Sequence, residues 1–181
     1  SREVFSFSID AILLARFPRL PKRGKIVDLC AGNGAVGLFA SSKTNAQIIE
    51  LEIQERLADM ATRSIELNGL NDRMSVINDN LNRALDHLHT SSADLIFCNP
   101  PYFKVDSDES HLNESKHYTL ARHELTTNLD EIFSVSKKLL KTNGHIAMVH
   151  RPERFLEIVD KMRANNLQPK WIQFVYPKAN Q

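Results

Sequence analysis

Cysteine is scarce in this sequence, with two residues, Cys30 and Cys98, among 181. Two isolated thiols in apolar runs cannot build the disulfide framework of a small secreted protein, so we expect a reducing, cytoplasmic location. The sequence also lacks any apolar run near the ~18 residues of a membrane span. It shows no apolar leader segment either, so we expect neither membrane insertion nor a secretory signal.

Net charge is also small, at +1 near neutral pH, and by itself it favours no class of partner. The charges are unevenly distributed, however. Residues 1–25 hold six basic and two acidic side chains, and residues 137–181 hold nine basic and three acidic ones. Two basic ends around an acidic middle could bind an anionic partner such as nucleic acid, although solvated helix faces explain them equally well.

Short apolar runs alternate with amphipathic segments along most of the chain. The expected strands are Lys25–Cys30, Ala46–Glu52, Arg73–Asn78, Ala93–Cys98, Gly144–His150 and Trp171–Tyr176. The expected helices are Ser8–Phe17, Ala35–Lys43, Gln54–Asn68, Leu81–His89, Asn128–Leu140 and Glu153–Asn165. This alternation predicts an α/β fold with a doubly wound, mostly parallel sheet, and we expect residues 1–181 to form one domain with a helical segment in 1–24.

The polar stretch 103–127 departs from this alternation. Ordered loops of that length are uncommon and usually functional or mobile. We interpret the stretch as a flexible substrate loop. An insertion without a role is the alternative.

A glycine-rich segment, DLCAGNGAVG, begins at Asp28, directly after the first expected strand. Gly32 and Gly34 permit a tight turn and a close approach of a ligand to the backbone. Glu52 ends the second expected strand, where a carboxylate can accept hydrogen bonds from both hydroxyls of a ribose. Glu50 points the same way by the period of two, but Glu52 better fits the edge of the loop.

The carboxylate of Asp28 distinguishes two possible ligands for this loop. It would repel a pyrophosphate but attract a cation. The pattern D-x-x-x-G-x-G therefore resembles the S-adenosyl-L-methionine (SAM) loop of class I methyltransferases more than a dinucleotide loop. In that fold a polar side chain after the third strand often contacts the adenine amino group, and Asp79 or Asn80 could do so. An Asx turn that caps the helix at Leu81 is a compatible alternative.

The most specific motif is Asn99-Pro100-Pro101-Tyr102, directly after the fourth expected strand. Two prolines fix two φ angles and remove two N–H donors, so the Asn99 amide oxygen and the Pro100 carbonyl can face a substrate as acceptors. Two acceptors on a planar amine make its lone pair available and stabilise the charge that develops on methylation. Tyr102 offers a face for a stacked ring, and such alignment contributes ~7–11 kcal/mol. A rigid turn without a chemical role is the alternative.

DLCAGNGAVG together with CNPPY resembles the class I amino methyltransferases of the N-P-P-Y type, over nearly the whole chain. FSFSIDAILL (5–14), ARHE (121–124) and HRPER (150–154) look like the bacterial valine-tRNA adenine-37 N6-methyltransferases. The resemblance implies a Rossmann-like fold and methyl transfer from SAM to N6 of an adenine in RNA, expected to be adenosine 37 of a tRNA. S-adenosyl-L-homocysteine (SAH) would be the product. Ribosomal-RNA guanine-N2 methylation and protein glutamine N5-methylation remain alternatives.

The resemblance also implies roles for individual residues. Those expected at the cofactor are Asp28, Cys30, Ala31, Gly32, Asn33, Gly34, Glu52, Ile53, Asp79, Asn80 and Asn99. Asn99, Pro100 and Tyr102 would hold the target base. The segment near Ser8 and Asp10 would pack beside the methionine end of SAM. The candidates for RNA contact are Arg122, His123, Arg151 and Arg154, although a surface or ion-pair role is at least as well supported for each.

Four further expectations concern the sheet, metals, the two cysteines and assembly. The family pattern is a seven-stranded sheet of order 3-2-1-4-5-7-6, and no seventh strand is visible after Trp171–Tyr176 in this sequence. We expect no metal, because no histidine or cysteine spacing is that of a zinc site. The thiols of Cys30 and Cys98 could lie close together as inert groups, since strands one and four adjoin in this fold. We expect a monomer.

Overall fold

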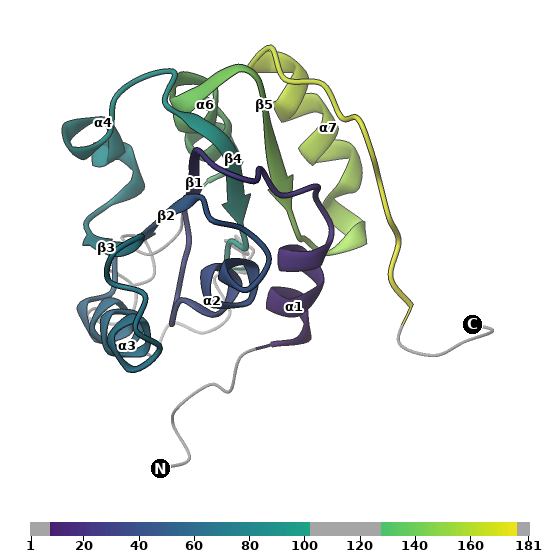
Figure 1. The fold of residues 1–181 in the computed structure, drawn as a ribbon. Coiled ribbons are helices and arrows are strands. Elements are labelled where there is room, and N and C mark those ends of the chain that lie inside the picture. Colours follow the sequence, from purple (N-terminus) through teal and green to yellow (C-terminus); the bar gives the residue numbers. More distant parts are fainter. Residues whose placement is uncertain (1–7, 102–127, 177–181) are drawn as a thin grey trace, which may run out of the picture.

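A computed structural model describes residues 8–101 and 128–176 of the chain (Figure 1). Its sheet contains β1 (Lys25–Asp28), β2 (Gln47–Glu52), β3 (Met74–Asn78), β4 (Ala93–Cys98) and β5 (Leu140–Met148). The five strands follow the order β3-β2-β1-β4-β5, and every neighbouring pair is parallel. The chain therefore moves outward from β1 to β3 and then crosses to β4. Ligands of open α/β sheets bind where the strand order reverses in this way, here at the carboxyl ends of β1 and β4.

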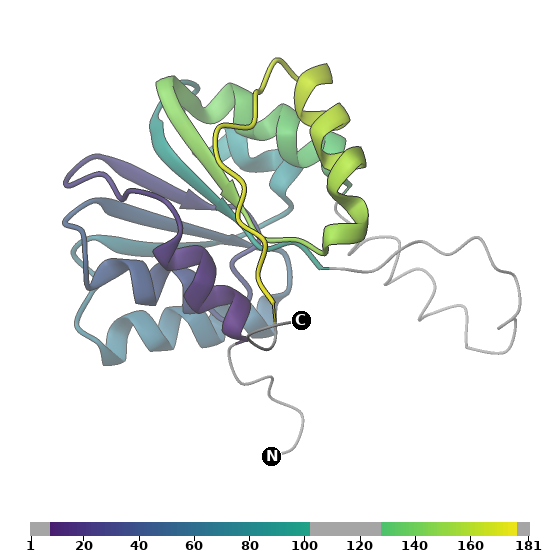
Figure 2. The same cartoon turned by 90° about the vertical axis from the view of Figure 1, so that its right-hand side faces the viewer.

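Helices cover both faces of this sheet (Figure 2). One layer contains α1 (Ile9–Arg16), α2 (Ala35–Ser41) and α3 (Glu55–Leu67), and the other contains α4 (Ala84–His87), α6 (Leu129–Leu139) and α7 (Phe155–Ala164). Short 3-10 turns, η1 (Leu81–Arg83) and η3 (Pro152–Arg154), precede α4 and α7. The predicted doubly wound α/β fold is confirmed, with helix boundaries that differ by a few residues.

Alternate strand residues supply the two halves of the core. Ile26 and Ile48 pack with α1 and α2, whereas Val27 and Ile49 pack with Phe133 and its neighbours on α6. Burying each such side chain contributes about 1.5–3 kcal/mol. Because neighbouring parallel strands place paired residues on the same face, this pattern also determines the direction of the polar residues that end each strand.

The boundary between α6 and β5 differs from the prediction. The sequence predicts a helix that ends at Leu140 and a strand that begins at Gly144, but α6 ends at Leu139 and β5 begins at Leu140. Asn143 lies within β5 with φ +66°, and the pairing of β4 with β5 shifts register between Ala93 and Leu95. The Asn-Gly pair therefore forms an irregularity inside the strand, which is a common use of these residues in sheets.

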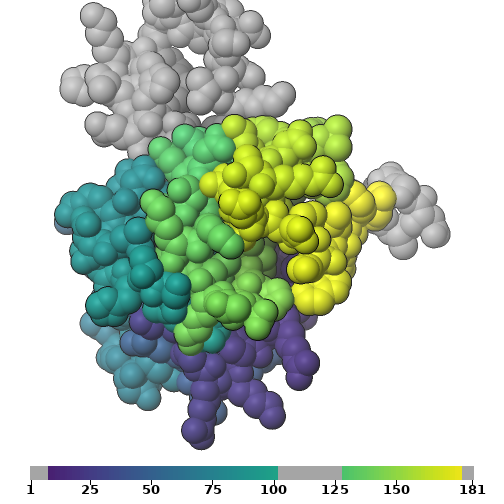
Figure 3. Space-filling model, turned by 90° about the horizontal axis from the view of Figure 1, so that it is seen from above, coloured from purple at the N-terminus to yellow at the C-terminus, as the bar shows by residue number. Residues whose placement is uncertain are grey.

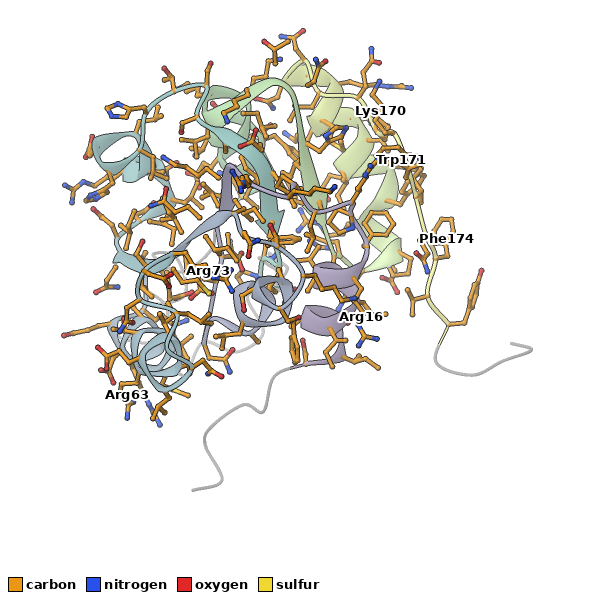
Figure 4. The ribbon with its side chains drawn as sticks, in the orientation of Figure 1. Arg16, Arg63, Arg73, Lys170, Trp171 and Phe174 are labelled. Carbon is orange, nitrogen blue, oxygen red and sulfur yellow. The ribbon has the colours of Figure 1, made fainter. Side chains whose placement is uncertain are left out.

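The prediction of a strand over Trp171–Tyr176 is wrong. These residues form no strand in the structure, and Trp171 and Tyr176 are 71% and 65% exposed. Ring contacts hold the segment instead: Trp171 stacks on His145 of β5 at 5.8 Å, and Phe174 meets Phe155 of α7 at 6.0 Å (Figure 4). Aromatic and β-branched residues indicate a segment that packs well against a surface. They do not show that a neighbouring strand is available for backbone hydrogen bonds.

The end of the described chain lies next to the surface of β5 and α7 in the space-filling view (Figure 3). The expected substrate loop, 103–127, falls outside the described residues. The described part of the chain contributes only the five strands above, so it contains no seventh strand. Within the same part, no helix is both long and apolar enough to cross a bilayer.

Candidate active site

The glycine loop connects β1 to α2 and is anchored on both sides. The Leu29 N–H donates to the Phe97 carbonyl of β4 at 3.0 Å, and the Ala31 N–H donates to the Leu51 carbonyl of β2 at 3.1 Å. Gly32 and Gly34 have φ of +57° and +80°, a region that favours glycine over every other residue. The loop is thus a fixed turn at the point where the strand order reverses.

Glu52 closes this turn from the end of β2. Its Oε2 accepts from the Gly32 N–H at 2.8 Å, and its Oε1 accepts from the Gln54 N–H at 2.8 Å. Burial raises the pKa of Glu52, and the backbone hydrogen bonds oppose that rise. Glu52 therefore lies at the edge of the loop as predicted, while its contact with a ribose stays a prediction.

Two other buried carboxyl groups lie behind the loop. Asp28 of β1 pairs in register with Glu50 of β2, so both side chains point to the face that carries α2. Burial raises the pKa of Asp28 to about 7 and that of Glu50 to about 9. Among the described residues, Asp28 Oδ2 and both Glu50 oxygens lack a hydrogen-bond partner. The sequence indicated the direction of Glu50 but not its burial, which depends on how closely α2 packs.

The turn after β3 holds Asp79 and Asn80. Asn80 Oδ1 accepts from the Asn82 N–H at 2.9 Å and caps η1, so the alternative of an Asx-type cap is confirmed. Asp79 lies 2.8 Å from His87 Nε2 and 3.3 Å from an Arg83 guanidinium nitrogen. The hydrogen bond with His87 is the main reason why the pKa of Asp79 is lowered. A contact with adenine stays a prediction for both residues.

The Asn-Pro-Pro segment leaves the carboxyl end of β4 beside the glycine loop. Pro100 is buried, Asn99 is half-buried and Pro101 is exposed; Tyr102 lies outside the described residues. The Sγ atoms of Cys30 and Cys98 are 3.8 Å apart, so the two thiols meet as the sequence suggested. A hydrogen bond with Cys30 and burial raise the pKa of Cys98, which keeps it a thiol. This contact joins the two motifs directly.

The candidate RNA-contact residues are only partly described. Arg122 and His123 lie outside the described residues. Arg151 is exposed, and Arg154 forms an ion pair with Glu157 at the start of α7. The ion-pair alternative for Arg154 is therefore present in the structure. Across 8–101 and 128–176, no three His, Cys, Asp or Glu side chains gather as a set of metal ligands.

The family model described as "Conserved hypothetical protein 95" matches residues 13–151. The chain belongs to this family. The matched range runs from α1 past the end of β5 and contains both the glycine loop and the Asn-Pro-Pro segment. The site at the strand reversal thus lies inside the part of the chain that defines membership.

Several curated relatives carry the name tRNA1(Val) (adenine(37)-N6)-methyltransferase. The protein of Shewanella loihica is 29% identical over 145 residues, which are 78% of this chain and 58% of that protein. The protein of Parabacteroides distasonis is 28% identical over 168 residues, which are 93% and 69%. The chain therefore spans a little over half the length of the Shewanella relative.

Solved methyltransferases share the fold at low sequence identity. A predicted O-methyltransferase from Agrobacterium tumefaciens aligns with a TM-score of 0.63 and 19% identity, covering 84% of this chain and 66% of that one. Geranyl diphosphate C-methyltransferase from Streptomyces coelicolor A3(2) aligns with a TM-score of 0.58 and 12% identity, covering 88% and 53%. These alignments confirm the expected Rossmann-like class I methyltransferase fold.

Proposed function

We propose that this chain is the SAM-binding and catalytic part of an RNA methyltransferase. Its target is N6 of an adenine, and the preferred substrate is adenosine 37 of a tRNA. The observation that carries the proposal is the meeting of two motifs at the strand reversal, where Cys30 of the glycine loop touches Cys98 beside Asn99. The names of the curated relatives support the choice of tRNA over ribosomal RNA or a protein glutamine.

The residues around the loop fit SAM better than a dinucleotide. SAM supplies a methyl group on a positively charged sulfur when it is bound. Asp28 and Glu50 lie buried behind the loop, and no ion pair in the described ranges involves either of them. In its ionised form, Asp28 attracts a cation and repels a pyrophosphate. The residues proposed to hold SAM are Asp28, Cys30, Ala31, Gly32, Asn33, Gly34, Glu52, Ile53, Asp79, Asn80 and Asn99.

The proposed catalytic groups act by orientation and by hydrogen bonding. The Asn99 amide oxygen and the Pro100 carbonyl accept the two N–H groups of the target amine, which directs its lone pair toward the methyl group. The same acceptors stabilise the positive charge that develops on the nitrogen, an effect worth ~10²–10³ in rate for one such group. The methylated nitrogen then loses a proton to solvent, so no strong base is required. Stacking of the base on Tyr102 completes the proposal.

Access to this site requires an unstacked base. An adenine in a single-stranded loop costs less to extrude than one inside a duplex, and sequence-specific RNA recognition favours such loops. Basic residues near both ends of the sequence, including Arg151 and Arg154, are proposed to contact phosphates. A monomer in the cytoplasm remains our expectation for the protein.

Methyl transfer from labelled SAM to tRNA that lacks its own modifications tests the proposal. We expect N6-methyladenosine among the digested nucleosides, and we expect Asn99→Ala to reduce the rate by at least ~10²-fold through loss of an acceptor. Asn45→Ala is the matched control. Asn45 is exposed and precedes β2, so it lies at the amino ends of the strands, whereas the site lies at their carboxyl ends. Label in ribosomal RNA as N2-methylguanosine, or in a protein glutamine, would overturn the choice of substrate and keep the site.

A further inference from the structure

Three carboxyl groups converge on one side of the glycine loop. Asp28 ends β1, and Glu50 and Glu52 are alternate residues at the end of β2, so all three side chains point to the face that carries α2. Each is buried, with exposed fractions of 0% for Asp28 and Glu50 and 6% for Glu52. Burial of three acidic groups this close together is costly unless each is neutral or compensated.

Glu52 is the best compensated of the three, because backbone N–H groups of Gly32 and Gln54 satisfy both of its oxygens. Asp28 Oδ1 accepts one long hydrogen bond, 3.5 Å, from the Cys30 N–H. Within the described part of the chain, Asp28 Oδ2 and both oxygens of Glu50 have no hydrogen-bond partner. Burial is the largest cause of the raised pKa at Asp28, about 7, and at Glu50, about 9; the charge of Asp28 adds to the rise at Glu50. Near neutral pH, Glu50 therefore carries a proton and Asp28 carries one about half of the time.

Glu50 is held in this position by glycines. A Cβ atom on Gly34 would lie 2.6 Å from Glu50 Oε2, and one on Gly37 would lie 2.2 Å from Glu50 Oε1. The carboxyl group therefore fills the space that these two glycines leave beneath the start of α2. A carboxyl group at this position interacts electrostatically with any charged ligand that binds at the loop.

The described elements around the pair add no cation. α2 has no titratable side chain, and α3 contributes Ala61 next to Gly34. β4 contributes Phe97 in register with Asp28, followed by the Cys98 thiol, which faces Cys30. Within 8–101 and 128–176, the titratable groups around the pair are thus Glu52, Cys30 and Cys98, and none of them supplies a positive charge. The inference therefore takes the positive charge from the ligand.

We propose that Asp28 and Glu50 form a proton-carrying pair beneath the glycine loop, and that the pair releases a proton to solvent when SAM occupies the loop. This inference rests on the proposed function. A positive charge stabilises the ionised carboxylate and so lowers the pH at which the pair gives up its protons. Asp28 is the member closer to the loop, whereas Glu50 is a positioning residue that acts through Asp28 and the start of α2.

Calorimetric titration of the purified chain with SAM, in buffers of different ionisation enthalpy, measures this release. We expect up to about half a proton per SAM at pH 7, since Asp28, with its pKa of about 7, is then about half protonated. For the same reason the Kd for SAM should fall about tenfold between pH 6 and pH 8. SAH, whose sulfur is uncharged, should release clearly less.

Three variants separate the members of the pair. Asp28→Asn should abolish the release at pH 6.5 and weaken SAM binding, whereas Glu50→Gln should keep the release at pH 6.5 and remove that at pH 8.5. The control Asp59→Asn alters an exposed carboxylate of α3 that pairs with Arg63, and it should match the parent chain at both pH values.

Two results would overturn the inference in different ways. If SAM binds with the same Kd from pH 6 to pH 8 and with an enthalpy independent of the buffer, the proton-carrying pair is wrong while the proposed function stands. If the folded chain binds neither SAM nor SAH at any pH, the proposed cofactor site is wrong and the inference falls with it.

Discussion

At the scale of single residues, Gly37 and Glu50 occupy one packing site. The spacing of Gly32, Gly34 and Gly37 suggested a ligand-binding turn, but Gly37 lies within α2 and the structure gives it a different reason. A side chain there would collide with the carboxyl group of Glu50. Gly37 thus accommodates a buried acid, Gly34 does so while it also shapes the turn, and Gly32 shapes the turn only.

We predict that Gly37→Ala destabilises the chain by about 1–3 kcal/mol, because the added methyl group overpacks a full site. The cost should shrink when Glu50→Ala is introduced as well, since the second change makes room for the methyl group. Denaturant unfolding of both single variants and the double variant measures the coupling. A coupling below about 0.5 kcal/mol would mean that Gly37 and Glu50 do not share the site.

The buried carboxyl groups also lead to a prediction of how the free energy of unfolding depends on pH. Because the pKa of Glu50 is higher in the folded chain than in the unfolded one, the folded state binds more protons between pH ~4.5 and ~9. The free energy of unfolding should therefore fall as the pH rises through that window.

The Glu50→Gln variant tests whether Glu50 causes the free energy of unfolding to fall as the pH rises. Between pH 5 and pH 8, the free energy of unfolding should fall less steeply with pH in the variant than in the parent chain, by up to about 1.4 kcal/mol per pH unit. Denaturant unfolding across that range measures the slope, with Asp59→Asn as the control. If the parent and Glu50→Gln chains show parallel profiles, then Glu50 does not carry a proton in the folded state.

At the scale of secondary structure, the sequence predicted most elements because their signals are local. Residues such as Ile48 and Ile96 lie in short apolar runs with turn residues around them, and they form central parallel strands. Trp171–Tyr176 has the same composition and forms no strand. A helix satisfies its own backbone, whereas a strand requires a partner that composition alone does not reveal.

The same segment offers a test, because Trp171 is the only tryptophan of the chain. With 71% of its surface exposed, it should fluoresce as a solvated indole and be quenched readily by acrylamide. Trp171→Ala should cost about 0.5–1.5 kcal/mol through loss of the stacking on His145. A blue-shifted, protected emission would mean that the segment is covered in solution.

At the scale of the whole molecule, the candidate site exists because β1 and β4 are neighbours. The sequence placed the glycine loop and the Asn-Pro-Pro segment in the correct elements, and the expectation of adjoining strands brought them together. The sequence did not predict how deeply Asp28 and Glu50 are buried, or that Glu52 accepts a hydrogen bond from the Gly32 N–H. Both depend on how α2 and the loop pack against the end of β2.

Ligand binding at this site should stabilise the whole fold. SAM at about 100 times its Kd should add ~2.7 kcal/mol to the free energy of unfolding, which thermal denaturation detects as a higher Tm. We expect Asn99→Ala to lose a small part of this shift and Asp28→Asn to lose most of it, because Asn99, although proposed to touch SAM, is proposed to act mainly on the target base. Equal shifts for both variants would contradict that division of roles.

Contact between β1 and β4 also has a consequence for the order of folding. Cys30 and Cys98 are 68 residues apart in the sequence, so closing this contact requires a long loop to form. A partly folded chain in which only β1, β2 and β3 had paired would already contain the glycine loop, but not the proposed acceptors at Asn99 and Pro100. We expect pulsed hydrogen exchange to show protection of β4 no earlier than that of β2, so that a newly made chain acquires a place for the methyl donor before it acquires the means to use it.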